Sequence, residues 1–302
     1  MAGKRRQSSN KALWWLLGTA IAGGLVIGGL GLRALPGSPL AANAANSFQG
    51  GSASPSASKS PTPSPSPSLP PLAVRPAKVS VETSGWYSWA LLDRRTGKIS
   101  GSKNLATTST TASMIKAWIA ADYLRRAADQ GVTPNATRME QLRIMIRDSD
   151  NAAAISLWSA VGGIASTKRL VSMCKLTDSK PHSNWSNTAL SARDTARMGA
   201  CIVDGRAAGK KWTKWLLDEM RAVRGVGDFG IRKAFTADVA ETIAIKNGWV
   251  TRDATGEWHV NCLAVGDQWT MGVLTQYPAN LGYEHGAKIC KSVATQLKTP
   301  TS

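Results

Sequence analysis

The first 81 residues contain no aspartate or glutamate, although the chain of 302 residues has 19 acidic residues in all. Histidine occurs three times, and the four cysteines are spaced unlike zinc ligands, so we expect neither a metal nor another cofactor. Basic stretches interleaved with aromatic residues are lacking, which argues against nucleic acid as a partner despite a net charge of +18. Residues 79–302 carry 29 of the 37 Lys and Arg. This excess of positive charge suits anionic surfaces such as membrane headgroups or cell-wall polymers.

Charge is also absent from Ala12 to Leu32, a run of 21 residues. This length can cross a bilayer as a helix, and the basic residues before it place the N-terminus in the cytoplasm. We therefore expect a cytoplasmic tail over residues 1–11 and a single-pass membrane anchor over residues 12–34, with the remaining chain exported. A cleaved secretory signal with its site at Ala42–Ala44 is the alternative. A lipoprotein anchor is excluded because no cysteine closely follows the run.

Large apolar residues are scarce in the stretch that follows. Residues 45–76 are mostly Ser, Pro and Ala, and proline alternates with small polar residues over Pro61–Pro67. Such a composition cannot bury a core and stays extended. We assign residues 35–78 to a disordered spacer and residues 79–302 to the folded domain.

The folded part has strand patterns at both ends and helical patterns between them. Trp86–Leu92 is typical of a strand, followed by a turn over Asp93–Gly97 and a returning strand over Lys98–Lys103. Helical spacing of apolar residues recurs over 113–128, 137–146, 151–161, 166–176, 191–205 and 210–223. Strand patterns return at 242–245, 259–265 and 269–277, before a last helix over 286–297. This order predicts an α+β domain, in which helices and a helical subdomain flank an antiparallel sheet.

The helix expected from Ser113 begins with a pair of reactive groups, Ser113 and Lys116, in the sequence Ser-Met-Ile-Lys. Residues three apart share a helix face, so the hydroxyl and the amine can meet. Serine needs a nearby base to act as a nucleophile, and a buried lysine with a lowered pKa can be that base. The same pattern also occurs at 8–11, 56–59, 100–103 and 172–175. By itself it is therefore equally compatible with an N-cap serine beside a solvated lysine.

Two further motifs follow along the chain. Ser149-Asp150-Asn151 lies between two expected helices, and Lys246-Asn247-Gly248 closes an expected strand. Ser-x-x-Lys, Ser-Asp-Asn and Lys-x-Gly, in this order and setting, resemble the serine β-lactamase and penicillin-binding protein superfamily, and class A β-lactamases most closely. The resemblance spans Val79 to Leu297 and implies a β-lactamase/transpeptidase-like fold.

The resemblance also implies a role for each matching residue. Ser113 is expected to be the acylated nucleophile, Lys116 its base and Ser149 the relay that protonates the leaving group. Lys246 is expected to supply positive charge beside Ser149 and the substrate carboxylate. The expected substrate-binding residues are Asn151, Asn247, Gly248 and Trp249. Backbone N–H groups of Ser113 and Trp249 are expected to form the oxyanion hole.

The sequence departs from the class A pattern in two places. Between Glu140 and Glu219 there is no glutamate, whereas class A enzymes carry one on this stretch that activates water for deacylation. The corresponding residues 180–187 offer His182, Asn184 and Asn187, and Asp178 lies just before them. For both His182 and Asp178, a role in a loop turn or cap is the simpler interpretation. Asn247 stands where the family prefers a hydroxyl that binds the substrate carboxylate. The acylation machinery is therefore complete, while turnover is expected to be impaired.

We accordingly expect an exported, monomeric serine acyl-hydrolase that is acylated at Ser113 by β-lactams or peptidoglycan stem peptides and then deacylates slowly. The alternatives are a D-Ala-D-Ala peptidase and a catalytically degenerate binding or sensor domain at the cell wall. The four cysteines lie in the exported part, where disulfides persist, and they allow three pairings. We predict Cys174–Cys201 and Cys262–Cys290. The twelve tryptophans are expected in core and rim packing rather than in a sugar-binding platform.

Overall fold

The computed structural model describes residue 69 and residues 72–299. The expected membrane anchor over residues 12–34 lies outside the described residues, as does most of the proline-rich spacer. Within the described part, no helix is both long and apolar enough to cross a membrane.

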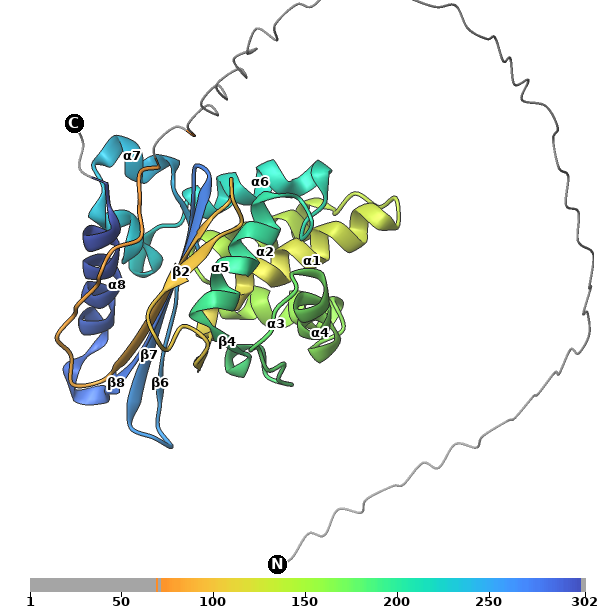
Figure 1. Cartoon of the computed structure of the whole chain (residues 1–302). Helices are drawn as coiled ribbons and strands as arrows, with labels where there is room; N and C mark the ends of the chain where they lie inside the picture. Colours follow the sequence, from red (N-terminus) through yellow and green to blue (C-terminus); the bar gives the residue numbers. More distant parts are fainter. Residues whose placement is uncertain (1–68, 70–71, 300–302) are drawn as a thin grey trace, which may run out of the picture. The chain divides into compact units, whose positions relative to one another are not determined.

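The described residues build one antiparallel sheet with helices on both faces (Figure 1). Its strand order is β2-β1-β8-β7-β5, and β6 also pairs with β7. The strands are β1 Trp86–Asp93, β2 Ile99–Gly101, β5 Ala244–Ile245, β6 Gly248–Arg252, β7 Glu257–Gly266 and β8 Trp269–Pro278. The central pair β7 and β8 is in register from Glu257 opposite Pro278 to Gly266 opposite Trp269. Since β5 and β6 both pair with β7, the chain between them, Lys246 and Asn247, interrupts the strand pairing at this edge of the sheet.

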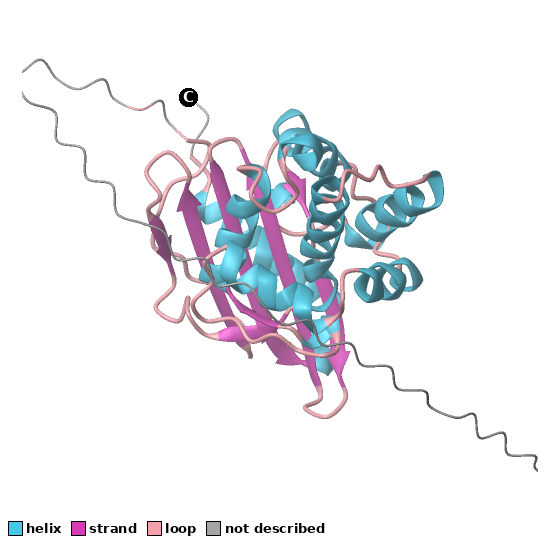
Figure 2. Cartoon of the chain, turned by 90° about the vertical axis from the view of Figure 1, so that its right-hand side faces the viewer, coloured by secondary structure: helices cyan, strands magenta, loops and turns pink. Residues whose placement is uncertain are grey.

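Helix α8 covers one face of this sheet, and α5 covers the other, with α1 and its neighbours forming the helical part beyond (Figures 1 and 2). The helices are α1 Lys116–Asp129, α2 Ala136–Arg147, α3 Asn151–Ala160, α4 Ile164–Met173, α5 Ala192–Val203, α6 Lys210–Arg221, α7 Ala237–Thr242 and α8 Tyr283–Leu297. Apolar side chains on both faces of the sheet are buried, so β7 and β8 are covered along nearly their whole length. The buried faces of the helices agree with the helical spacing seen in the sequence. The predicted α+β architecture is confirmed.

Several short elements were not predicted from the sequence. Strand β3 (Thr108–Thr110) pairs with β4 (Ala189–Ser191) in a second, two-stranded sheet. A 3₁₀ turn, η1 (Ala112–Ile115), precedes α1, so Ser113 lies in this turn rather than in the α-helix itself. Another 3₁₀ turn, η2 (Trp185–Asn187), lies in the loop before β4. Elements of three or four residues are too short to show a recurring apolar pattern.

The fold extends closer to the N-terminus than the expected boundary at Val79. Val74 is fully buried and forms an isolated β-bridge with Lys298. Next to it, the Arg75 N–H donates to the Leu297 carbonyl over 2.8 Å. The last residues assigned to the spacer therefore pack against the C-terminal end of the domain.

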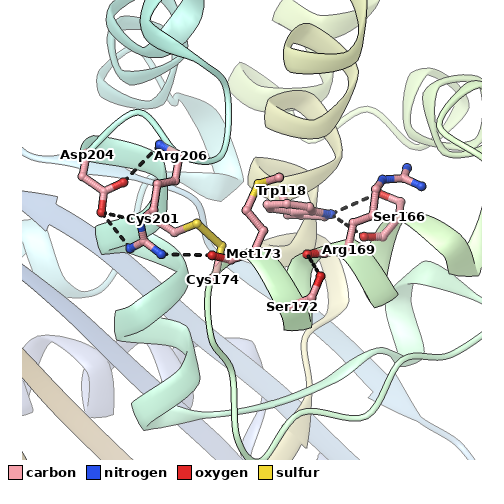
Figure 3. Close-up of a disulfide and its surroundings, with 9 residues drawn as sticks. All are labelled: Trp118, Ser166, Arg169, Ser172, Met173, Cys174, Cys201, Asp204 and Arg206. Atoms are coloured by element: carbon pink, nitrogen blue, oxygen red, sulfur yellow. Dashed lines mark hydrogen bonds and ion pairs between the residues drawn. A yellow bond between two sulfur atoms is a disulfide. The ribbon is translucent and has the colours of Figure 1, made fainter. Parts of the chain in front are cut away.

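Both predicted disulfides are present. Cys174–Cys201 connects the end of α4 to α5 (Figure 3), and Cys262–Cys290 connects β7 to α8. Near the first one, the Arg206 guanidinium donates to the Met173 carbonyl over 3.0 Å, which adds a second link between the same two regions. The pairs therefore fasten one helix on each side of the sheet, with α4 joined to α5 and α8 joined to the central strand β7.

Candidate active site

Ser113 lies in η1, in a turn with unusual backbone geometry. The preceding residue, Ala112, has a φ of +47°, a left-handed conformation that costs free energy for a residue with a Cβ and that often occurs at functional sites. Gly248 at the start of β6 packs directly on this turn. A Cβ atom at Gly248 would lie 2.2 Å from the Thr111 carbonyl oxygen and 2.8 Å from the Ser113 nitrogen. The glycine of Lys-x-Gly therefore allows the strand to approach the serine.

Lys116, the first residue of α1, is fully buried below this turn. Its Nζ donates to the Ser149 carbonyl over 2.6 Å and to Asn151 Oδ1 over 2.7 Å, and lies 3.4 Å from Ser149 Oγ. Burial lowers the pKa of Lys116 from 10.5 to about 7, although the charge of Asp150 opposes this shift. In its neutral form, the Lys116 amine directs its two N–H bonds at these two carbonyl oxygens. Its lone pair then remains available to accept a proton. Lys116 can therefore act as a base near neutral pH.

Ser149 connects the two lysines of the site. Its Oγ accepts a hydrogen bond from Lys246 Nζ over 3.0 Å, and its φ of +61° is again left-handed. Burial and the nearby charge of Lys116 lower the pKa of Lys246 well below its ordinary value, against the opposing charge of Asp148. The three sequence motifs thus meet: Ser-x-x-Lys from η1 and α1, Ser-Asp-Asn from the α2–α3 junction, and Lys-x-Gly from the β5–β6 junction.

The acidic residues on either side of Ser149 hold it in place. The Asp150 side chain caps α3 by accepting the Ala153 N–H over 2.6 Å. Asp148 accepts two hydrogen bonds from Arg224, at 2.6 and 2.9 Å. Because a cap and an ion pair fix its neighbours, Ser149 can keep its strained backbone conformation.

The expectation that Asn247 binds substrate requires a correction. Its side chain is only 1% exposed, and its Nδ2 donates to the carbonyl oxygens of Gly227 (3.1 Å) and Phe229 (2.8 Å). Successive residues of an extended chain point to opposite sides, so Lys246 and Gly248 face the serine while Asn247 points into the core. The side chain expected to bind substrate instead holds the loop that contains Phe229.

A groove with a volume of about 530 Å³ opens at Ser113. Helix α3 contributes one face of residues spaced four and three apart, Asn151, Ile155 and Trp158. Strand β6 contributes Trp249 and Val250. The remaining lining residues are Ala112, Ser183, Asn184, Trp185 and Ser186. The groove thus contains the predicted Ser113, Asn151 and Trp249, together with apolar residues that the sequence analysis did not identify as part of a site.

The loop between α4 and β4 places Trp185 beside the Lys116 amine. The Trp185 ring centroid is 4.8 Å from Lys116 Nζ, a cation–π distance when the amine is charged. The turn η2 that contains Trp185 is held by Arg252, which donates to the Ser186 carbonyl over 2.7 Å. His182, which the sequence analysis named on this loop, is exposed and accepts the Asn184 N–H at Nδ1 over 2.9 Å. It therefore has the turn-forming role that was the simpler interpretation.

Comparisons with known proteins bear on the fold. No protein-family model matches the chain. Two proteins named "Putative lipoprotein LppW", from Mycobacterium bovis and Mycobacterium tuberculosis, are 29% identical over 211 residues. The match covers 66% of this chain, which thus spans 65% of the length of those relatives.

Solved structures extend the comparison. A class A β-lactamase from Mycobacterium abscessus has a TM-score of 0.56 at 19% identity, covering 70% of this chain and 92% of that enzyme. A β-lactamase from Burkholderia vietnamiensis has a TM-score of 0.58 at 17% identity, covering 70% of this chain and 90% of that protein. At these low identities the likeness concerns the fold alone: residues 72–299 have the fold of class A β-lactamases.

Proposed function

We propose that this protein is an exported serine acyl-hydrolase that is acylated at Ser113 by β-lactams or by amides of peptidoglycan stem peptides, and that it deacylates slowly. The observation that carries the proposal is the buried amine of Lys116. It lies three residues after Ser113, with its N–H bonds directed at the Ser149 carbonyl and Asn151 Oδ1 and a pKa lowered to about 7. The fold shared with class A β-lactamases supports the same reading.

In the acylation step, the Lys116 amine removes the proton from the Ser113 hydroxyl as the oxygen attacks the substrate carbonyl. The backbone N–H groups of Ser113 and Trp249 stabilise the negative charge on the carbonyl oxygen, each worth about 3 kcal/mol in serine hydrolases. The bond from the carbonyl carbon to the leaving nitrogen then breaks. That nitrogen receives its proton from Ser149 Oγ, which is hydrogen-bonded to Lys246 over 3.0 Å and can be reprotonated from the lysines.

Deacylation lacks a dedicated base in this proposal. Among the described residues that line the groove, none is Asp or Glu. The loop instead places the Trp185 ring 4.8 Å from the Lys116 amine. An indole cannot accept a proton from water at neutral pH. General-base catalysis typically speeds a reaction by a factor of about 10² to 10⁴. The acyl-enzyme should therefore persist longer, by that factor, than one whose deacylation has a dedicated base.

Localisation follows from the N-terminal sequence. We propose that residues 12–34 hold the protein in the membrane with the folded domain outside, since the uncharged run is 21 residues long. The mycobacterial relatives are named as lipoproteins. The first cysteine of the given sequence is Cys174, which is paired with Cys201.

Intact-protein mass spectrometry after exposure to benzylpenicillin tests this proposal. We expect one covalent adduct on Ser113, no adduct in Ser113→Ala, and rapid consumption of one β-lactam per enzyme before a slow steady state. Rapid linear hydrolysis without an adduct would contradict slow deacylation. A protein that forms no adduct with penicillins or stem peptides would instead be the cell-wall binding domain named as the alternative.

A further inference from the structure

We infer that the groove selects acyl groups that carry an uncharged aromatic or apolar side chain, through the three tryptophans Trp158, Trp185 and Trp249 that surround Ser113. The inference rests on the proposed acylation of Ser113 and deepens it by naming the substrate class. It concerns the side chain on the acyl part of the substrate, and not the part that carries the nitrogen released from the carbonyl carbon.

The chemistry of the groove wall carries the argument. Four of its larger side chains are apolar or aromatic, namely Ile155, Trp158, Trp185 and Trp249. Ile155 is 61% exposed, one of the large apolar residues of the described chain that remain in water. An apolar residue on the wall of a hollow, beside a reactive serine, is stabilised when an apolar ligand group displaces water from it.

Charge is missing where an anionic or cationic acyl group would need a partner. Among the described residues that line the groove, none is charged. The amines beneath it, Lys116 and Lys246, are both fully buried. The nearby Arg252 guanidinium already donates to the Ser186 carbonyl at 2.7 Å and to Thr110 Oγ1 at 3.1 Å. A carboxylate on the acyl side chain would therefore lose hydration without gaining an ion pair.

The aromatic walls are already fixed in place. The Trp249 ring meets the rings of Phe229 at 5.8 Å and Tyr283 at 6.1 Å, both edge to face. Trp185 is held over Lys116 and by the bond from Arg252 to its neighbour Ser186. A ring entering the groove thus finds surfaces that need little ordering, which favours binding. With about 530 Å³ of space, the groove lies within the range typical of small-molecule sites.

The test compares three penicillins that share one nucleus. Benzylpenicillin carries a phenylacetyl side chain, and carbenicillin carries the same side chain with an added carboxylate. In 6-aminopenicillanic acid this side chain is missing. The second-order rate constant for Ser113 acylation is measured for each by intact mass against time. We expect benzylpenicillin to react at least about tenfold faster than either of the others, since even one methylene more or less in a hydrophobic pocket changes the rate about 10- to 200-fold.

Variants assign this preference to the groove. Trp158→Ala should lower the ratio of the benzylpenicillin rate to the 6-aminopenicillanic acid rate about tenfold, and Trp158→Phe should retain most of it. Trp212→Ala, on α6 and outside the groove, is the matched control and should leave the ratio unchanged. Because each variant is judged by a ratio of two rates, a partly unfolded sample does not imitate the effect.

The outcomes separate the two proposals. Equal rates for the three penicillins, or fastest acylation by carbenicillin, would overturn the inference while leaving Ser113 established as the nucleophile. A ratio that falls equally in Trp158→Ala and Trp212→Ala would overturn it as well. If none of the three forms an adduct on Ser113, the inference fails. The proposed function fails with it only if stem peptides also leave Ser113 unmodified.

Discussion

Two buried lysines share a single hydroxyl at the centre of this site. Lys246 Nζ is 3.0 Å from Ser149 Oγ, and Lys116 Nζ is 3.4 Å from the same oxygen. The charge of Lys116 lowers the pKa of Lys246, and burial lowers the pKa of both. Like charges this close oppose double protonation, so the cluster favours holding one extra proton rather than two. Proton transfer from Ser113 to a leaving nitrogen requires this capacity.

The first prediction concerns pH. Because the pKa of Lys116 is lowered to about 7, its neutral, basic form increases as the pH rises through 7. The acylation rate of Ser113 should therefore increase between about pH 6 and pH 8 and then level off. Lys116→Met should acylate about 10² to 10⁴ times more slowly and lose this dependence. Rates measured by rapid quench and mass spectrometry that fall or stay constant over this range would argue against Lys116 as the base.

The second prediction concerns Trp185. Replacing it by glutamate would place a carboxylate close to the Lys116 amine, at the position now occupied by a ring 4.8 Å away. We expect Trp185→Glu to speed acyl-enzyme breakdown by about tenfold or more, toward the 10² to 10⁴ that a well-placed base supplies. Trp185→Gln is the control, because glutamine has nearly the shape of glutamate without its charge. If both variants release the acyl group equally fast, admission of water rather than base catalysis explains the gain.

At the residue scale, the sequence was enough to select the residues that belong to recognisable motifs. Ser113, Lys116, Ser149 and Lys246 could be selected because three motifs occur in order, and the structure brings all three motifs together. The direction of the Asn247 side chain could not be deduced, because Lys-x-Gly falls where the chain leaves one strand and enters another. Trp185 was not predicted as a site residue because its loop has no periodic pattern that orients a side chain.

Among the elements, the contact of β6 with η1 decides the shape of the site. Gly248 leaves no room for a Cβ, which would lie 2.2 Å from the Thr111 carbonyl and 2.5 Å from the Met114 nitrogen. The strand and the serine turn must therefore separate if any side chain is added. Their contact sets the position of the Trp249 N–H relative to Ser113.

The third prediction follows from this contact. Gly248→Ala should reduce acylation of Ser113 at least about hundredfold, because losing one oxyanion-hole donor costs about 10² to 10³ in serine hydrolases. Thr251→Ala, at an exposed position of the same strand, is the control and should acylate normally. Near-normal acylation in Gly248→Ala would mean that the turn and the strand can shift without loss of the site. The measurement is the adduct yield against time with benzylpenicillin, beside a thermal melt of each variant.

Elements with many residues were predicted well, whereas several short ones were not, although the expected strands over 98–103 and 242–245 contain the short strands β2 and β5. The boundaries of α2, α3 and α6 differ from the expected ones by two residues or fewer. Their apolar spacing repeats over several turns, so the pattern is distinct. By contrast, β3 and β4 have three residues each, and their pairing depends on contacts between segments about 80 positions apart in the chain. Such contacts leave no local signal in the sequence.

At the scale of the whole molecule, the described fold closes on itself where its two ends meet. Residues just before Val79 run beside the end of α8, with Thr299 N–H donating to the Ala73 carbonyl over 2.9 Å and Thr299 Oγ1 donating to the Leu72 carbonyl over 2.8 Å. The spacer composition of residues 35–78 concealed this, because one buried valine among Ala, Pro and Arg does not form a strand pattern.

The last prediction tests that junction. A chain that begins at Val79 lacks the buried Val74 and the hydrogen bonds that residues 72–75 make with the C-terminal end. Burial of a valine contributes about 1.5 to 3 kcal/mol, and each hydrogen bond about 1 kcal/mol net. The conformational entropy lost when this segment is ordered offsets part of that gain. We therefore expect the free energy of unfolding in urea to be about 3 kcal/mol lower for a chain starting at Val79 than for one starting at Leu72. A chain starting at Ala45 serves as the control and should match the Leu72 chain, since its additional residues are spacer. Equal stability of the Val79 and Leu72 chains would show that the domain folds without this closing segment, and that the sequence-based boundary at Val79 is the functional one.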